Sequence, residues 1–212
     1  MSSKIILADD HPLILTGIRS LIAQSQLGCE VVAEVHQVSE LFKTLQKHRF
    51  DILITDFSMP GDTRSDGLVM IQNLRRSYPN LSIIVLTQIQ NAGILHALLK
   101  LGISGVLLKQ AVITELLDAI HHILSGREYL GHSVRKLLAE SNIADPDQAL
   151  QLTPKESEVV RLLANGMSVT QAAEYLNRSI KTISTQKKSA MQRLGLHSDS
   201  ALFQYAKEKG LI

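Results

Sequence analysis

The chain has 212 residues, of which 45% are hydrophobic and 20% are charged, and its formal net charge at pH 7 is +2. This composition excludes an intrinsically disordered protein, and the length allows one large domain or two small ones. No apolar run reaches the roughly 18 residues that a membrane span needs, and the N-terminus lacks a signal-peptide pattern. The single cysteine, Cys29, excludes an internal disulfide framework. We therefore expect a cytoplasmic protein with no membrane partner.

The first part of the chain alternates short apolar runs with stretches of helical periodicity. Five such repeats predict an α/β domain with a five-stranded, doubly wound parallel sheet and helices on both faces. We place this domain at residues 1–128. Its strands are expected at Lys4–Ala8, Glu30–Val35, Asp51–Thr55, Ser82–Leu86 and Gly105–Leu108, and its helices at Leu13–Gln24, Ser39–His48, Gly67–Ser77, Asn91–Leu101 and Ile113–Ser125.

The remainder of the chain lacks the alternation of apolar runs and helical stretches and is expected to contain a linker and a helical domain. Residues 129–149 are predicted to be a linker, with a possible short helix at Ser133–Ser141. A small all-α domain of four helices is expected at residues 150–212. Its first helix begins with a capping-box pattern, Thr153-Pro154-Lys155-Glu156, and a tight turn at Asn177-Arg178-Ser179 separates the second helix from the third. Two helices joined in this way predict a helix-turn-helix.

Positive charge is concentrated in this second part. Residues 1–130 contain 11 basic and 12 acidic residues, a balance of −1, whereas residues 131–212 contain 11 and 8, a balance of +3. Between Tyr175 and Ser198 there are basic residues and no acidic one. Charge of one sign favours a polyanion partner, although a solvated helix face is the alternative.

Carboxylates follow two of the predicted strands. Asp9 and Asp10 come directly after the first strand, and Asp56 ends the third. If these two strands are neighbours, the three carboxylates converge, because chemistry in such sheets gathers at the carboxyl ends of the strands. Three carboxylates in one pocket repel one another unless a cation neutralises them, and hard oxygen ligands suit Mg²⁺. Each residue alone could instead cap a helix or form a turn.

A hydroxyl and an ammonium follow two further strands. Thr87 ends the fourth strand and Lys109 follows the fifth. These are the groups that a phosphoryl group on Asp56 would need for its anionic oxygens. Thr87 is also ordinary in a strand, and Lys109 alone could be a surface residue. We favour the functional interpretation because all of these residues occur at strand ends.

Together, Asp9-Asp10, Asp56 with Met59-Pro60, Thr87 and Lys109 resemble the receiver domain of two-component response regulators, whose fold is flavodoxin-like. Leu152–Leu196 resembles the LuxR-type helix-turn-helix. The chain is therefore similar, over almost its full length, to response regulators of the NarL/FixJ type. Within this type the likeness is greatest to regulators of capsule synthesis, and it is carried by Ala8–Pro12, Ile54–Asp62 and Asn177–Ser184.

The resemblance implies that Asp56 is the phosphoacceptor and that Mg²⁺ is the cofactor. Asp10, Asp56 and the backbone carbonyl of Ser58 would bind the ion directly, and Asp9 mainly through a metal-bound water. Lys109 would pair with the phosphoryl group, and Thr87 would move to hydrogen-bond to it. The implied partner in phosphorylation is a sensor histidine kinase or a phosphotransfer protein.

The third helix of the tail is expected to enter the major groove of double-stranded DNA. By resemblance, Ser184, Thr185 and Lys188 match base-contacting positions, and Lys181, Thr182 and Lys187 would mostly hold phosphates. One helix reads little sequence, so we expect a homodimer, or a heterodimer with another LuxR-type regulator. The function predicted is that of a phosphorylation-controlled transcription regulator and not of an enzyme.

Two features depart from the receiver pattern. The loop Asp62–Asp66 makes the spacing between Asp56 and Gly67 longer than in many receivers, and Val106 stands where an aromatic residue is common. Two alternatives also stay open. A phosphatase of the haloacid dehalogenase class uses a strand-end Asp, but it needs a second acid where this chain has Ser58. A phosphate-independent regulator would use its receiver only to dimerise.

Overall fold

The computed structural model of the chain describes residues 2–47, 49–59, 66–141, 151–196, 198–208 and 211. The chain divides into two compact units, Met1–Asn142 and Ile143–Ile212. None of the helices in the described ranges has the length and apolar character of a membrane span. Residues 60–65, which include most of the loop Asp62–Asp66, and residues 142–149 of the expected linker lie outside the described ranges.

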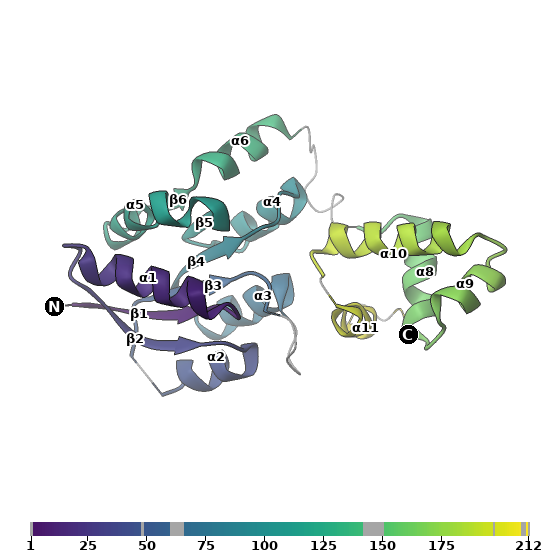
Figure 1. Cartoon of the computed structure of the whole chain (residues 1–212), viewed down its shortest axis with the longest axis horizontal. Coiled ribbons are helices and arrows are strands. Elements are labelled where there is room, and N and C mark those ends of the chain that lie inside the picture. Colours follow the sequence, from purple (N-terminus) through teal and green to yellow (C-terminus); the bar gives the residue numbers. More distant parts are fainter. Residues whose placement is uncertain are drawn as a thin grey trace. The chain divides into compact units, whose positions relative to one another are not determined.

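The first unit is built on a parallel sheet with the strand order β2-β1-β3-β4-β5-β6 (Figure 1). The first strand lies between the second and the third, so the neighbour relation that the predicted acidic pocket requires is confirmed. The strands are β1 (Ser3–Ala8), β2 (Cys29–Val35), β3 (Ile52–Asp56), β4 (Ser82–Thr87), β5 (Gly105–Leu108) and β6 (Tyr129–Leu130).

Helices cover this sheet, and its inner strands β1, β3, β4 and β5 are mostly apolar and buried, as expected of strands covered on both faces. Successive strand residues point to opposite faces, so Ile5, Leu7 and Ile54 share one face, where they join a core cluster with apolar residues of α1 and α5. The helices are α1 (Pro12–Gln24), α2 (Val38–Leu45), α3 (Gly67–Ser77), α4 (Ala92–Lys100), the short 3₁₀ helix η1 (Lys109–Ala111), α5 (Val112–Leu124) and α6 (His132–Glu140).

The doubly wound parallel fold is confirmed, with one strand more than the five predicted. The additional strand, β6, is held by hydrogen bonds from the Tyr129 N–H to the Ser104 carbonyl and from the Gly131 N–H to the Val106 carbonyl, both 2.9 Å. The first unit consequently extends to Asn142, past the boundary predicted at residue 128. A strand of two residues has no periodicity by which the sequence could reveal it.

Glu115 of α5 fixes the point at which β6 passes into α6. Its Oε2 accepts hydrogen bonds from the Tyr129 hydroxyl at 3.2 Å and from the His132 N–H at 2.9 Å. Gly131 lies so close that a Cβ there would be 3.2 Å from this Oε2. Val134 is fully buried, and α6 contacts α4 and β5. The helix expected in the linker therefore packs on the first unit.

The second unit contains four helices in the described ranges, as predicted. Its capping box is present: the Thr153 side chain accepts from the Glu156 N–H, and the Glu156 side chain accepts from the Thr153 N–H. Asn177 adopts a left-handed conformation (φ 52°) in the tight turn between the second and third helices. The helices are α8 (Pro154–Ala164), α9 (Val169–Tyr175), α10 (Ile180–Leu194) and α11 (Asp199–Glu208).

We predict that Glu115→Gln lowers the free energy of local opening of β6 and α6, and that the size of this effect depends on pH. Burial acts to raise the pKa of Glu115, but hydrogen bonds from His132 and Tyr129 outweigh it and lower that pKa. A carboxyl with a lowered folded-state pKa stabilises the fold above its unfolded-state pKa, about 4.3, and loses this effect as the pH falls through the folded-state value. At pH 7 the variant should lower the free energy of opening of residues 129–140 by about 1–2 kcal/mol.

Hydrogen exchange of the full chain, with labelling times scaled to the intrinsic exchange rate, measures this opening. The difference from wild type should shrink as the pH falls below about 4. Glu128→Gln, which changes an exposed glutamate one residue before β6, is the matched control and should exchange like wild type. Equal protection of residues 129–140 in wild type and Glu115→Gln at pH 7 would contradict the role assigned to Glu115.

Candidate functional site

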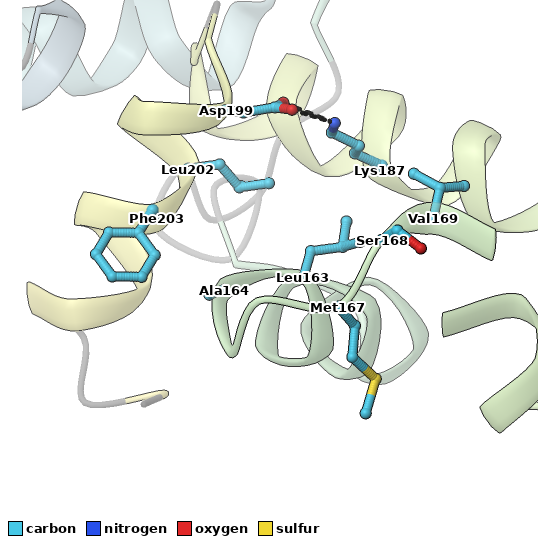
Figure 2. Close-up of a pocket in the computed structure, with 9 residues that line it drawn as sticks. All are labelled: Leu163, Ala164, Met167, Ser168, Val169, Lys187, Asp199, Leu202 and Phe203. Carbon is cyan, nitrogen blue, oxygen red and sulfur yellow. Dashed lines mark hydrogen bonds and ion pairs between the residues drawn. The ribbon is translucent and has the colours of Figure 1, made fainter. Parts of the chain in front are cut away.

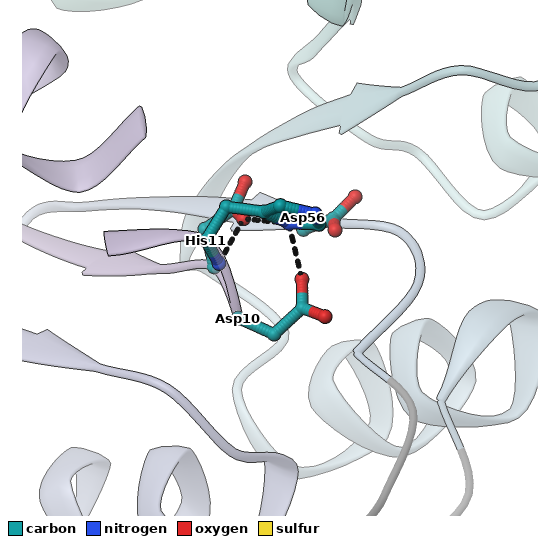
Figure 3. A group of neighbouring side chains, drawn as sticks. Asp10, His11 and Asp56 are labelled. Carbon is teal, nitrogen blue, oxygen red and sulfur yellow. Dashed lines mark hydrogen bonds and ion pairs between the residues drawn. The ribbon is translucent and has the colours of Figure 1, made fainter. Parts of the chain in front are cut away.

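The carboxylates predicted to form a pocket do converge at the carboxyl edge of the sheet (Figure 3). Asp56 is the last residue of β3, and Asp9 directly follows β1. Both are buried, at 3% and 1% exposure, whereas the side chain of Asp10 is 25% exposed. With His11, these residues offer ligand atoms that all lie within 4.8 Å of one another.

His11 is a member of this cluster that the sequence analysis did not single out. Its Nδ1 lies 2.7 Å from Asp10 Oδ1 and 3.1 Å from Asp9 Oδ1, and its backbone N–H donates to Asp9 Oδ1 at 2.9 Å. The residue occupies the N-cap position of α1, with Pro12 next to it. Its place directly after Asp9-Asp10 was the signal that could have identified it.

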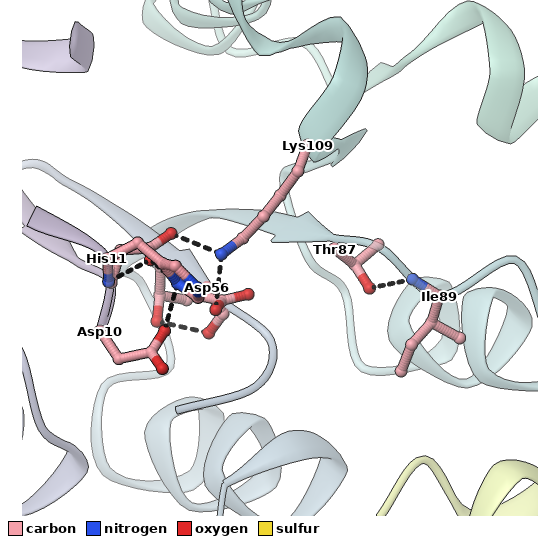
Figure 4. Close-up of polar contacts among 8 residues, drawn as sticks. Asp10, His11, Asp56, Thr87, Ile89 and Lys109 are labelled. Atoms are coloured by element: carbon pink, nitrogen blue, oxygen red, sulfur yellow. Dashed lines mark hydrogen bonds and ion pairs between the residues drawn. The ribbon is translucent and has the colours of Figure 1, made fainter. Parts of the chain in front are cut away.

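Lys109 joins the two buried carboxylates (Figure 4). Its Nζ lies 2.7 Å from Asp9 Oδ2 and 2.7 Å from Asp56 Oδ2, and its side chain is 7% exposed. Burial acts to lower the pKa of Lys109, but the hydrogen bonds to Asp56 and Asp9 outweigh it and raise the pKa. The ammonium therefore stays charged at neutral pH and partly neutralises the pocket.

Asp56 is the titrating group of the site. Burial raises the pKa of Asp56 to about 6, and the charge of Asp9 acts in the same direction. The hydrogen bond and charge of Lys109, together with the backbone N–H of Ser58, act to lower it. Removal of this carboxylate from water is thus compensated only in part, and a further cation in the pocket would be favourable.

Thr87 is close to the pocket but is engaged elsewhere. It is buried, and its hydroxyl accepts a hydrogen bond from the Ile89 N–H at 2.9 Å (Figure 4). The hydroxyl therefore holds the β4–α4 loop in this structure. Contact with a phosphoryl group on Asp56 would require Thr87 to move, as the resemblance implies.

Helix α10 carries the residues predicted to bind DNA. Five of the six are exposed: Lys181, Thr182, Ser184, Thr185 and Lys188. Some already use their hydroxyls on the helix itself, since Thr182 Oγ1 lies 2.8 Å from Ser179 Oγ and Thr185 Oγ1 donates to the Lys181 carbonyl at 2.8 Å. The structure brings these five side chains to the solvent side of α10.

The sixth residue, Lys187, is only partly exposed and is paired with an acidic residue. Its side chain is 21% exposed, and its Nζ forms an ion pair with both carboxylate oxygens of Asp199, at 2.6 and 2.7 Å. It lines a pocket of about 150 Å³ together with residues of α8, α9 and α11 (Figure 2). The sequence analysis treated Lys187 as a phosphate contact and did not foresee its pairing with Asp199.

Comparison with known proteins agrees with both halves of this description. Residues 5–121 match the response regulator receiver domain, and residues 150–206 match the bacterial regulatory proteins of the luxR family. The transcriptional regulatory protein RcsB of Escherichia coli (strain K12) is 46% identical over 202 residues, which cover 95% of this chain and 93% of that protein. The chain belongs to the RcsB-like response regulators.

More distant members and solved structures extend this comparison. The oxygen regulatory protein NreC of Staphylococcus aureus (strain JH9) is 31% identical over 99% of both chains. RcsB of Salmonella enterica serovar Typhimurium, solved on the promoter P1flhDC with the phosphomimetic BeF3⁻, is 45% identical with a TM-score of 0.70, over 97% of this chain and 98% of that one. An RcsB–DNA complex is 44% identical with a TM-score of 0.65, over 98% of each chain.

Membership of the RcsB-like family decides between the classes of function left open by the sequence. The family consists of DNA-binding transcription regulators, so the phosphatase alternative is set aside. The residues of the acidic pocket fit a hard cation, because three carboxylates offer oxygen ligands within a few ångströms.

For this RcsB-like regulator we predict that Lys109→Met raises the pKa of Asp56 above its value of about 6. The variant removes the opposite charge that favours the ionised carboxylate, and leaves Asp9 to repel it. A titration of ¹³C-labelled aspartate carboxyls by NMR, on the metal-free full chain, measures the shift. Lys47→Met, an exposed lysine far along the sequence, should leave it unchanged. A pKa that stays the same or falls in Lys109→Met would exclude the ion pair in solution.

Proposed function

We propose that this RcsB-like regulator accepts a phosphoryl group on Asp56 and that this modification controls the binding of α10 to double-stranded DNA. The observation that carries the proposal is the buried pair of Asp9 and Asp56, joined by Lys109 at 2.7 Å to each. Asp56 is the carboxylate at the strand end that has both a fixed cation and a raised pKa of about 6. Such perturbed groups concentrate at functional sites.

Mg²⁺ is the cofactor that we propose for the pocket. Asp10, Asp56 and the backbone carbonyl of Ser58 would bind it directly, and Asp9 through a water. This donor set consists of oxygen atoms, which Mg²⁺ prefers, and it leaves room for a phosphoryl group. When bound, the ion neutralises charge on the phosphoryl oxygens.

Each side chain of the pocket has a separate role in phosphoryl transfer. A carboxylate oxygen of Asp56 attacks phosphorus as the bond from phosphorus to the donor breaks. Lys109, which already contacts this carboxylate, pairs with an equatorial oxygen of the phosphoryl group. Thr87 then moves away from the Ile89 N–H, and its hydroxyl donates a hydrogen bond to another of these oxygens. Phosphorylation thereby replaces the hydrogen bond that Thr87 accepts from the β4–α4 loop with one that Thr87 donates to the phosphoryl group.

These contacts have the magnitude that a switch needs. Charge-assisted hydrogen bonds contribute about 1.5–3 kcal/mol each, so bonds from Lys109 and Thr87 to the phosphoryl group contribute at most roughly 3–6 kcal/mol, less the contribution of the bonds to Asp56 and Ile89 that they replace. Reversing a two-state equilibrium from 1:99 to 99:1 takes about 5.5 kcal/mol. The loop that Thr87 releases leads into α4. In this helix, His96 Nε2 lies 3.3 Å from the Oγ of Ser141, the residue that follows α6. A shift of α4 therefore reaches the segment that leads to the second unit.

The second unit is the proposed DNA-binding domain, at residues 150–212. Ser184, Thr185 and Lys188 would read base edges, and Lys181 and Thr182 would hold phosphates. We propose a dimer on DNA, which the structure of RcsB dimers bound to DNA supports. A homodimer is the simplest form, and a heterodimer with another LuxR-type regulator is the alternative. The phosphoryl donor would be a sensor histidine kinase or a phosphotransfer protein in the cytoplasm.

Phosphorylation of the full chain tests the first half of the proposal. With Mg²⁺ and acetyl phosphate, wild type should gain the mass of one phosphoryl group, which hydroxylamine should remove because the product is an acyl phosphate. Asp56→Asn should gain none, since an amide cannot accept the group. Asp118→Asn, an exposed aspartate of α5, is the matched control and should behave like wild type. Equal phosphorylation of Asp56→Asn would overturn the assignment.

The same three proteins test control of DNA binding. With Mg²⁺ and beryllofluoride, wild type and Asp118→Asn should bind a duplex carrying the P1flhDC sequence at least tenfold more tightly than without it, a change of about 1.4 kcal/mol. Asp56→Asn should show no such increase. Tight binding by untreated wild type, with no response to beryllofluoride, would instead support the phosphate-independent regulator.

Lys181→Met tests the DNA-contacting face of α10. Loss of an exposed lysine that holds a phosphate should weaken binding and reduce the slope of log affinity against log salt by about one. Fluorescence anisotropy of a labelled duplex, measured over a series of salt concentrations, gives both quantities. An unchanged slope would show that Lys181 does not contact a phosphate of DNA.

A further inference from the structure

Lys187 differs from the other lysines of α10 in where it stands on the helix. It lies four residues after Ile183 and three before Ala190, both of which are fully buried. This spacing places Lys187 beside the buried stripe of α10, roughly 60° around the helix from Ser184 and roughly 100° from Lys188. Its hydrocarbon stem lines the pocket between the helices of the second unit (Figure 2).

The charge of Lys187 is matched by Asp199. Both oxygens of the Asp199 carboxylate lie within 2.7 Å of Lys187 Nζ. Asp199 begins α11 and its side chain is 75% exposed, so the carboxylate is on the surface while the lysine is largely covered. Lys181 and Lys188, in contrast, are exposed.

A phosphate of DNA would therefore have to compete with a carboxylate for Lys187. If Lys187 left the pair to meet a phosphate, the exposed carboxylate of Asp199 would remain beside α10 without its cation. That charge would repel the backbone of DNA and offset the gain from the new contact. Opening the pair near DNA therefore carries an electrostatic cost.

We propose that Asp199 is a specificity-determining residue that holds Lys187 in a neutral ion pair and keeps it from the DNA backbone. The pair removes one positive charge from the part of binding that is independent of sequence, and leaves the contacts of Ser184 and Thr185 with bases unchanged. Because non-specific affinity is electrostatic, this restraint widens the ratio of specific to non-specific binding. The inference rests on the proposed DNA-binding function.

The salt dependence of binding to a mixed-sequence duplex tests the proposal on the full chain. Each phosphate contact contributes about 0.9 to the slope of log affinity against log salt. Asp199→Asn should release Lys187, raise the slope by about one and tighten non-specific binding about two- to fivefold. The double variant Lys187→Met with Asp199→Asn removes the pair without changing net charge, and should restore the wild-type slope.

One further variant and a measurement of helix content separate the possible failures. Asp199→Glu keeps the carboxylate and should bind like wild type, whereas a loss of helix in any variant would appear in its circular dichroism. A double variant whose slope falls as far as that of Lys181→Met would overturn the proposal, because Lys187 would then contact a phosphate in the wild type. An unchanged slope in Asp199→Asn would overturn it as well. If wild type shows no salt-dependent binding of DNA, the proposed function fails instead.

Discussion

The repulsion between two buried carboxylates is the constraint on which the first unit depends. A parallel sheet brings the ends of β1 and β3 together, and with them Asp9 and Asp56, in a place from which water is largely excluded. Lys109 is the group that makes this arrangement tolerable, at 2.7 Å from each carboxylate. One ammonium does not compensate two carboxylates, so the pKa of Asp56 stays raised and the pocket favours further positive charge.

Because of this excess negative charge, the pocket responds to the binding of a cation or to the addition of a phosphoryl group. A metal ion or a phosphoryl group changes the balance of charge and hydrogen bonds by several kilocalories per mole, comparable with the free energy that separates two conformations of a domain. Thr87 holds the β4–α4 loop through its bond with Ile89, and in the proposed function it would connect that balance to the loop. The segment β6–α6 then continues the connection, since Glu115 ties it to α5 and His96 contacts Ser141.

In the second unit, the electrostatic constraint is the amount of positive charge on α10. A helix that approaches DNA must be positive, but each added phosphate contact also strengthens binding to every other sequence. On α10, exposed lysines stand beside the hydroxyls of Ser184 and Thr185, and Asp199 neutralises the lysine at the edge of the buried stripe. Arg178, in the turn before α10, is likewise paired, with Glu158 of α8 at 2.9 Å. The basic segment is therefore less positive than its composition indicates.

The sequence by itself determined which segments along the chain form strands and helices, the positions of acidic and basic residues at the ends of strands, and the capping box at Thr153. These features are local: period, caps and turn residues are read within a few positions of the chain. Tertiary structure decided what depends on neighbours distant in sequence. A strand of two residues exists only because β5 offers it an edge, and the pKa of Asp56 is raised mainly because packing removes water from its carboxylate. Lys187 meets Asp199 only because α10 and α11 both pack against α8, and no local pattern encodes that contact.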